Sequence, residues 1–203
     1  MTITKKSTIL LTDDAHRIQI VENTAYIANW IQGGLQIWNV DPGLATPTFL
    51  GKYVDATSKS RGVQVVGNLA YVADQEFGLK VINISTPSAP TLVGNYDTPG
   101  TAYRVKVVGN KAYVADSTSG VQIIDVTTPS GVPTPVLPPF LGNAPTTDAR
   151  TTDVAGNYLY VADYTSGLKI FNASSPFSPV GSLTSVRVKQ QGIKPIQDKA
   201  LVF

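Results

Sequence analysis

The chain has 203 residues but no cysteine, one histidine and one methionine. Without cysteine it can form no disulfide framework, no thiolate metal site and no cysteine nucleophile. Charge is scarce as well: charged residues make up 15% of the chain, and 16 basic side chains against 14 acidic ones leave a net charge of +2. Proteins that bind nucleic acid usually concentrate basic residues on one face, so this composition predicts no nucleic-acid partner.

Long apolar runs are missing too. Near the N-terminus, the apolar run Ile9–Leu11 is far too short for the core of a signal peptide, and no cleavage motif follows it. No segment approaches the roughly 20 apolar residues that a membrane-spanning helix needs. We therefore expect neither a classical export signal nor a membrane span in this sequence. The lack of cysteine does not decide the compartment.

What the sequence does contain is a repeat. Residues 111–116 read Lys-Ala-Tyr-Val-Ala-Asp, and a polar turn that ends in Gly120 connects them to a second apolar run at 121–126. Four related copies occur, and their tyrosines, spaced 45, 42 and 47 residues apart, are Tyr26, Tyr71, Tyr113 and Tyr160. A period of forty-odd residues holds four short strands and is typical of a β-propeller. The predicted fold class is therefore an all-β propeller of four-stranded blades.

Each copy divides into four expected strands. The first strands are expected at 17–21, 62–66, 104–108 and 151–155. The second strand carries the Tyr-Val-Ala run and is apolar on both faces, so each sheet is expected to pack between two neighbours. A Gly-Asn turn, suited to a tight hairpin, joins these two strands in three copies, and Glu22-Asn23 replaces it in the first. The fourth strands are expected at 48–53, 91–96, near 140–142 and at 179–183.

We expect the whole chain, 1–203, to form one propeller domain. Its repeats run approximately over 13–53, 60–96, 103–142 and 150–184. Residues 7–12 resemble a fourth strand with no blade before it, and 186–189 resemble a first strand, so 185–203 are expected to be a partial blade or a tail. Two arrangements stay open: a ring whose termini share a partial fifth blade, and an incomplete ring cut from a longer array. The proline-rich insertion at 131–139 is expected to form a loop at the rim.

In these repeats the chain resembles the LVIVD-repeat family, propeller repeats of large bacterial and archaeal cell-surface proteins. The motif that names the family corresponds to Leu79–Asn83, Val121–Asp125 and Leu168–Asn172, and its Gly-Asn-x-Ala-Tyr-Val-Ala-Asp run stands at 67–74 and 109–116. The resemblance covers about residues 8–184. Copy one departs from it, since it lacks the Gly-Asn turn and has Trp38 in place of an aliphatic residue. The resemblance implies a binding or scaffold role at the cell surface, with no catalytic residues to carry over and no cofactor.

Four arginines form the first candidate site. Arg17, Arg61, Arg104 and Arg150 all stand where a first strand begins, the strand that lines the central channel of a propeller. They could form a cationic ring near one mouth, where arginine suits bidentate contacts to carboxylate or phosphate. The alternative is that each arginine pairs with a nearby aspartate or backbone carbonyl and ties the blades together.

Three aromatic residues form the second candidate site. Trp30, Phe77 and Tyr164 occupy the tips of hairpins in three repeats. Exposed on one rim, they could stack on sugar rings or dock a protein partner. The alternative is that they pack against the adjacent blade.

The remaining polar residues give no metal site. His16 stands beside two aspartates and is expected to be a solvated loop residue. The repeated Asp74, Asp116 and Asp163 occur one per blade, whereas calcium needs several oxygens from one loop. We expect them to accept hydrogen bonds from backbone N–H groups of their own turns.

The sequence thus predicts a non-enzymatic propeller module that acts as an interaction or scaffold domain, with a protein or glycan partner and no cofactor. Two alternatives stay open: a ligand-binding or enzymatic propeller that uses the arginine-lined mouth, and a carbohydrate-binding propeller that uses the rim aromatics. An incomplete ring would expose apolar blade faces and favour self-association.

Overall fold

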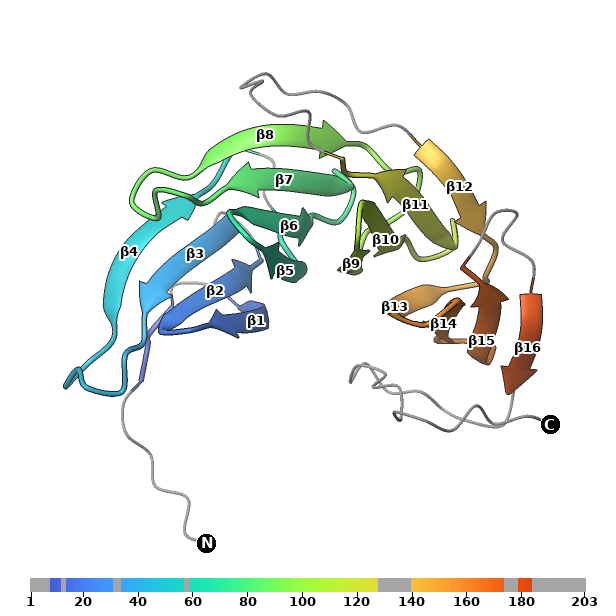
Figure 1. Ribbon diagram of the computed structural model, residues 1–203, viewed down its shortest axis with the longest axis horizontal. Coiled ribbons are helices and arrows are strands. Elements are labelled where there is room, and N and C mark those ends of the chain that lie inside the picture. Colours follow the sequence, from blue (N-terminus) through green and yellow to red (C-terminus); the bar gives the residue numbers. More distant parts are fainter. Residues whose placement is uncertain are drawn as a thin grey trace, which may run out of the picture.

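The computed structural model describes residues 8–11, 14–30, 34–56, 59–127, 140–173 and 179–183. These residues form sixteen strands in four antiparallel sheets, and each sheet follows the order of the chain from an inner to an outer strand (Figure 1). The described part of the chain contains no helix, and so none that could cross a membrane. The prediction of four four-stranded blades is confirmed.

We number the blades along the chain. Blade 1 consists of β1 (Ala15–Val21), β2 (Thr24–Asn29), β3 (Gly34–Asn39) and β4 (Thr48–Tyr53). Blade 2 consists of β5 (Gly62–Val66), β6 (Leu69–Ala73), β7 (Leu79–Asn83) and β8 (Thr91–Tyr96). Blade 3 consists of β9 (Arg104–Val108), β10 (Lys111–Ala115), β11 (Val121–Asp125) and β12 (Phe140–Ala144). Blade 4 consists of β13 (Ala149–Ala155), β14 (Tyr158–Asp163), β15 (Gly167–Asn172) and β16 (Pro179–Leu183).

A two-residue turn joins the two inner strands of every blade, as the Gly-Asn pairs predict. The first turn residue takes a positive φ: Gly67, Gly109 and Gly156 lie at +56°, +58° and +54°. Glycine adopts this conformation without the steric cost that a side chain brings. In blade 1 the same position is Glu22 at +52°, so its turn is closed with a residue that is less suited to it.

The outer strand of each blade carries a β-bulge next to a glycine, which bends the strand. In blade 1 the bulge glycine is Gly51, and it faces the next blade. A Cβ atom added there would lie 2.2 Å from the Pro87 carbonyl oxygen and 2.9 Å from the Ser88 Cα. Glycine therefore allows a loop of blade 2 to pack directly on the backbone of blade 1.

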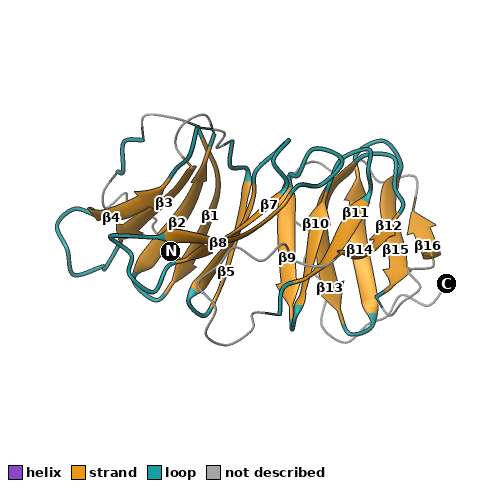
Figure 2. Cartoon of the chain, turned by 90° about the horizontal axis from the view of Figure 1, so that it is seen from above, coloured by secondary structure: helices purple, strands orange, loops and turns teal. Residues whose placement is uncertain are grey.

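The hydrophobic core lies between the blades. Three clusters of buried side chains fill the three junctions, each combining one blade with the next. Alanines on the second strands, such as Ala28 and Ala115, have 0% exposure and let neighbouring sheets approach closely. Each fully buried Val, Leu or Ile contributes about 1.5–3 kcal/mol. Stability therefore comes from stacking one blade on another, and Figure 2 shows the blades side by side.

The four blades follow an arc whose inner edge is formed by β1, β5, β9 and β13, with blades 1 and 4 at its two ends (Figure 1). One face of blade 4 is less buried than the equivalent faces of the other blades. Tyr160, Leu168 and Ile170 are only half-buried there, whereas their counterparts in blades 1–3 are at most 8% exposed. On blade 1, Ile18 and Ile20 are 53% and 51% exposed. Each end blade therefore keeps one apolar face that no described blade covers.

Three predicted segments do not belong to the described strands of the four blades. The described residues 8–11 form no strand, so the expected fourth strand at 7–12 is not found there. The partial fifth blade expected at 185–203 and the rim loop at 131–139 lie outside the described residues.

Candidate functional site

Polar residues in the middle of the inner strands tie neighbouring blades together. The side-chain amide of Gln19 accepts a hydrogen bond from the Val65 N–H (2.7 Å) and donates one to the Val65 carbonyl (3.3 Å). Gln64 repeats both bonds on the next inner strand, at 2.8 and 3.1 Å. At the third junction Lys106 forms an ion pair of 2.8 Å with Asp153. These contacts fix the inner strands relative to one another and so position the side chains at their ends.

In blades 2–4 the aspartate that ends or follows the second strand orders the loops around the inner strands, and in blade 1 this position is Asn29. Asp163 accepts hydrogen bonds from the N–H groups of Thr165 (3.1 Å) and Ser166 (3.0 Å) in its own turn, as predicted. Asp163 also accepts from the Thr147 N–H at 2.7 Å, in the connection that arrives from blade 3. Asp74 and Asp116 accept from the equivalent connections and, among the described residues, not from N–H groups of their own turns. The predicted turn role is therefore corrected for these two, because spacing along the chain cannot show which loop folds back onto a carboxylate.

A buried ion-pair network joins blades 1 and 2. Lys80 is 4% exposed and pairs with the carboxylates of Asp55 and Asp74. The Tyr53 hydroxyl donates to Asp55 at 3.1 Å, and burial followed by the charge of Asp55 raises the pKa of Tyr53 to about 12. The Phe77 ring lies 5.6 Å from Lys80 Nζ, so this half-buried aromatic belongs to the network.

The four candidate arginines occupy two registers of the inner strands. Arg17 and Arg104 each pair with an alanine of the second strand, whereas Arg61 and Arg150 lie one position earlier. Successive side chains of a strand point to opposite faces. The four arginines are therefore not equivalent positions of the four blades.

Three of these arginines nevertheless meet at one end of the inner strands. Arg61, Arg104 and Arg150 surround a small hollow together with His16 and Tyr103, and we call these five residues the arginine mouth. The hollow encloses about 20 Å³, enough for roughly one water molecule. Any larger ligand has to lie over the mouth, not inside it.

Aromatic rings and guanidinium groups alternate across the mouth. The Arg61 guanidinium carbon lies 4.0 Å from the Trp30 ring centroid and 4.9 Å from that of Tyr103. The Arg150 guanidinium carbon lies 4.3 Å from Tyr103 and 5.2 Å from Tyr164. All four distances fall within the roughly 6 Å over which a ring attracts a cation. We call these five residues the cation–π ladder; they hold two guanidinium planes between rings.

Each arginine of the mouth is anchored on one side. Arg104 Nη1 donates to the Arg61 carbonyl at 2.9 Å, across the junction of blades 2 and 3. Arg150 Nη2 lies 2.7 Å from the Asp148 carboxylate. Arg61 faces the buried Gln75, whose amide oxygen lies 2.7 Å from Arg61 Nε in the orientation that satisfies both groups. The predicted alternative paired each arginine with an aspartate or a carbonyl that ties blades together, and among these three anchors only the Arg104 bond crosses from one blade to the next.

Positive charge in the mouth is not balanced. Within the described ranges, no carboxylate lies within 4.0 Å of a guanidinium nitrogen of Arg61 or Arg104. Burial, and then the charges of Arg17 and Arg61, lower the pKa of Arg104 to about 10. A lowered arginine pKa means that the charged form is held at a cost, which an anion would relieve.

His16 is not the solvated loop residue that the sequence predicts. It belongs to β1, is half-buried, and its ring centroid lies 4.7 Å from that of Trp30. Burial, and then the charge of Arg61, lower its pKa, so the imidazole is neutral at pH 7. Its Nε2 is buried with no hydrogen-bond partner among the described residues.

The predicted aromatics separate into two groups. Trp30 and Tyr164 directly follow the last residue of a second strand and join the arginines in the cation–π ladder. Phe77 lies farther along its turn and packs near Lys80. Sequence reasoning missed Tyr103, the central ring of the ladder. A signal was present, because Tyr103 stands directly before the first-strand arginine Arg104.

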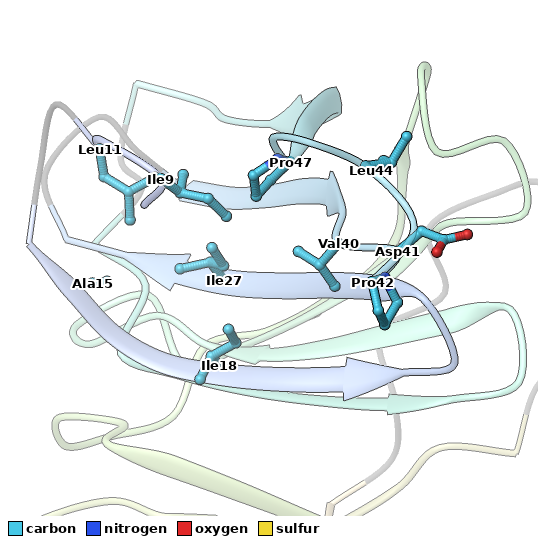
Figure 3. Close-up of a pocket in the computed structure, with 10 residues that line it drawn as sticks. All are labelled: Ile9, Leu11, Ala15, Ile18, Ile27, Val40, Asp41, Pro42, Leu44 and Pro47. Carbon is cyan, nitrogen blue, oxygen red and sulfur yellow. The ribbon is translucent and has the colours of Figure 1, made fainter. Parts of the chain in front are cut away.

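A larger hollow of about 410 Å³ lies on the open face of blade 1 (Figure 3). Ile18 of β1 and Ile27 of β2 lie on one side of it, and Ile9, Leu11 and Pro47 lie across from them (Figure 3). Its lining is almost entirely apolar and offers no convergent polar groups for chemistry. Nor do the described residues place three or more His, Cys, Asp or Glu side chains where they could hold a metal ion.

Solved structures share this fold at low sequence identity. The β-propeller domain of Myceliophteria thermophila Cps50 (Swd1) matches with a TM-score of 0.72 and 11% identity over 91% of this chain and 65% of that one. A Lactobacillus plantarum protein matches with a TM-score of 0.70 and 16% identity over 88% of this chain and 58% of that one. BamB from Moraxella catarrhalis matches with a TM-score of 0.64 and 16% identity over 87% and 52%.

This chain therefore spans about half to two-thirds of the length of these three proteins. No curated protein matches it in sequence. The family model of the LVIVD repeat matches residues 58–98, 99–134 and 147–184, which correspond to blades 2, 3 and 4. Blade 1 has the same strand order without a match, in keeping with its Glu-Asn turn and Trp38. From its three matched repeats and its four-stranded blades, the chain belongs to the LVIVD repeat family.

Proposed function

We propose that this chain is a non-enzymatic interaction module that binds an anionic group of a partner at the arginine mouth. The observation that carries the proposal is the gathering of Arg61, Arg104 and Arg150, because no carboxylate of the described chain lies within 4.0 Å of the guanidinium nitrogens of the first two. Like charges in a partly buried site repel one another, and a bound anion removes that repulsion.

The shape of the mouth supports binding more than catalysis. Small-molecule and cofactor sites usually enclose about 300–1,000 Å³, whereas this mouth encloses about 20 Å³. Its side chains are permanent cations and rings, together with His16, whose lowered pKa leaves it neutral. We infer that the mouth is a contact surface for a group that projects from a partner.

Carbohydrate binding by the aromatics has less support. Stacking on a sugar needs an open ring face. The Trp30 ring has His16 at 4.7 Å and Arg61 at 4.0 Å, so its neighbours already contact it. Tyr164 is 62% exposed and is the open end of the cation–π ladder. We infer that Tyr164 contacts the same partner at the edge of the mouth.

A binding measurement tests the proposal. We would titrate the protein into a fluorescent peptide that carries both glutamate and phosphoserine, and follow anisotropy. Arg104→Gln should weaken binding about tenfold or more, because a hydrogen bond to a charged group contributes about 1.5–3 kcal/mol. Lys52→Gln, a change of one exposed cation on an outer strand, is the matched control and should bind as the wild type does. Equal binding by Arg104→Gln, with its fold intact by circular dichroism, contradicts the proposal.

Self-association is a second proposed property, and the open faces of the end blades favour it. On blade 4, Tyr160, Leu168 and Ile170 match residues that are buried against the next blade in blades 1–3. On blade 1, Ile18 and Ile20 match Val63 and Val65, which pack against the blade before. The two faces are therefore complementary, and we propose that they pair between copies. Light scattering should show a mass above 21.6 kDa that falls with Ile18→Asp; a wild-type monomer at high concentration contradicts this.

We further propose, from the family resemblance, that the module is a scaffold segment of a surface-associated protein. Labelling of intact cells with a reagent that cannot cross the membrane checks this. Labelling of the protein only after lysis would contradict it.

A further inference from the structure

We propose that the group bound at the arginine mouth is a phosphate monoester dianion and not a carboxylate. This inference rests on the proposed function and names its ligand class. Four features of the mouth carry it: its charge, the directions of its donors, the rigidity of its arginines, and two buried nitrogen atoms without partners.

Balancing the positive charge of the arginine mouth requires more than one negative charge. Arg150 is balanced by Asp148 at 2.7 Å. Arg61 and Arg104 have no such partner in the described part of the chain, so the mouth keeps two unbalanced positive charges. A carboxylate brings one negative charge, whereas a phosphate monoester brings about 1.5–2 at pH 7. The dianion therefore balances most of the excess with a single group.

The donors approach from several directions. Arg61 precedes β5, Arg104 begins β9 and Arg150 lies in β13, so three blades supply the guanidinium groups. Arg61 is anchored by Gln75, Arg104 by the Arg61 carbonyl, and Arg150 by Asp148 and by a side-chain hydrogen bond to Tyr103. A carboxylate has two oxygens in one plane, whereas the three terminal oxygens of a phosphate monoester point apart. Donors that converge from three blades match the phosphate.

The arginines are also held in place before a ligand binds. Arg61 lies between the rings of Trp30 and Tyr103, and Arg150 lies between those of Tyr103 and Tyr164. A guanidinium plane that is already fixed loses less conformational freedom when it binds a ligand. Such preorganisation favours bidentate recognition of an oxyanion.

Two nitrogen atoms of the mouth are buried with no hydrogen-bond partner among the described residues: Arg150 Nε and His16 Nε2. A buried polar atom without a partner is costly, and its presence in a native structure marks a place where a ligand or water completes the bonding. The hollow beside them holds about 20 Å³. Because these two atoms are buried, a phosphate that lies over the mouth would reach them through a water molecule in the hollow, with its ester substituent outside.

The fluorescence of Trp30 reports on the site directly. The chain has two tryptophans, and Trp38→Phe leaves Trp30, in contact with Arg61, as the only one. In this variant we would titrate inorganic phosphate and acetate at pH 8 and equal ionic strength. Phosphate should bind at least about tenfold more tightly than acetate, and Arg104→Lys, which keeps the charge but not the fork, should lose most of that preference. Calorimetry on the wild type provides the same comparison without the tryptophan change.

The outcomes separate this inference from the function on which it rests. Equal affinity for phosphate and acetate, both lost in Arg104→Gln, overturns the phosphate assignment and leaves an anion-binding mouth. No binding of either ion, and none of the anionic peptide, overturns both. A phosphoserine peptide and glucose 6-phosphate then identify the source of the ester: tighter binding of one assigns a protein or a sugar source. Equal binding means that the phosphate alone is recognised, and each of these three results supports the inference.

Discussion

The guanidinium carbon of Arg61 lies 4.0 Å from the centre of the Trp30 ring, across the junction of blades 1 and 2. This contact joins two sets of residues that appear separate in the sequence, the first-strand arginines and the hairpin aromatics. Through Tyr103 it continues to Arg150 and Tyr164, so all four blades contribute to one surface. The geometry of the arginine mouth therefore depends on the contacts that hold neighbouring blades together.

Removing the Trp30 ring, the first of the cation–π ladder, should weaken anion binding at the arginine mouth. Trp30→Leu keeps an apolar side chain but removes the ring over Arg61. A cation–π contact contributes about 0.5–2 kcal/mol, so we expect affinity for the anionic peptide to fall about twofold to thirtyfold. Phe77→Leu, which changes an aromatic outside the ladder, is the control and should bind as the wild type does. Wild-type affinity in Trp30→Leu would show that the ring does not support Arg61.

The glutamine contacts between inner strands should contribute to stability. Gln64→Ala removes two hydrogen bonds and leaves the N–H and carbonyl of Val107 without them, and Val107 is 6% exposed. Leaving buried polar groups unsatisfied costs about 1–3 kcal/mol. Urea denaturation should show a loss of that size, against less than about 0.5 kcal/mol for the exposed Lys52→Ala. Equal stability of the two variants would refute a role for Gln64 in joining the blades.

Two bulge glycines provide a matched pair of substitutions. In Gly51→Ala the new methyl would lie 2.2 Å from the Pro87 carbonyl oxygen, so the junction of blades 1 and 2 has to shift, at a cost of about 1–3 kcal/mol. In Gly181→Ala, at the same position of blade 4, the nearest atom to the methyl is 3.9 Å away. We expect this second change to be nearly neutral in thermal and urea unfolding. A costly Gly181→Ala would mean that something packs on the outer strand of blade 4.

Asp116 should make stability depend on pH. It is fully buried, and burial raises its pKa from 3.8 to about 6 in spite of hydrogen bonds from Thr98 and Gly100. Folding therefore favours the protonated form. This contribution is fully present below about pH 4 and is lost as the pH rises through about 6, a change of about 2–3 kcal/mol at most. Asp116→Asn removes the titration, so the stability of the wild type relative to the variant should fall between pH 4 and pH 8.

Asp163 is the control for this pH effect. Burial raises its pKa, but hydrogen bonds from Thr147, Thr165 and Ser166 outweigh that effect and lower the pKa below its usual value. The charged form is therefore the stabilising one, and its contribution is lost on acidification. Relative to Asp163→Asn, the wild type should gain stability as the pH rises from below 4. The same direction of change for both aspartates would contradict the account of Asp116.

The strands could be read from the sequence because they depend on local patterns. The Gly67-Asn68 turn and the Tyr-Val-Ala runs recur with the period of a blade, and strands such as β4 and β8 begin and end at the predicted residues. Blade faces were predictable for the same reason, because a strand that is apolar on both sides requires two neighbours.

The mouth was only partly predictable because its contacts cross between blades. The sequence places Arg61 and Arg104 near the start of an inner strand. It does not show that the two stand in different registers, or that Arg104 donates a hydrogen bond to the Arg61 carbonyl. Tyr103 was missed and His16 was wrongly expected to be a solvated loop residue, because their roles depend on side chains from another blade or another strand. Spacing along the chain cannot report such contacts.

The central claim is that Arg61, Arg104 and Arg150 bind one anion together, and side-chain NMR tests it most directly. The Nε–H resonance of each arginine can be followed while inorganic phosphate is added to the wild-type protein. All three should shift with the same apparent dissociation constant, and Arg150 should move because its Nε is buried without a partner among the described residues. If the three resonances stay fixed, or titrate with unrelated constants, the arginine mouth is not a binding site.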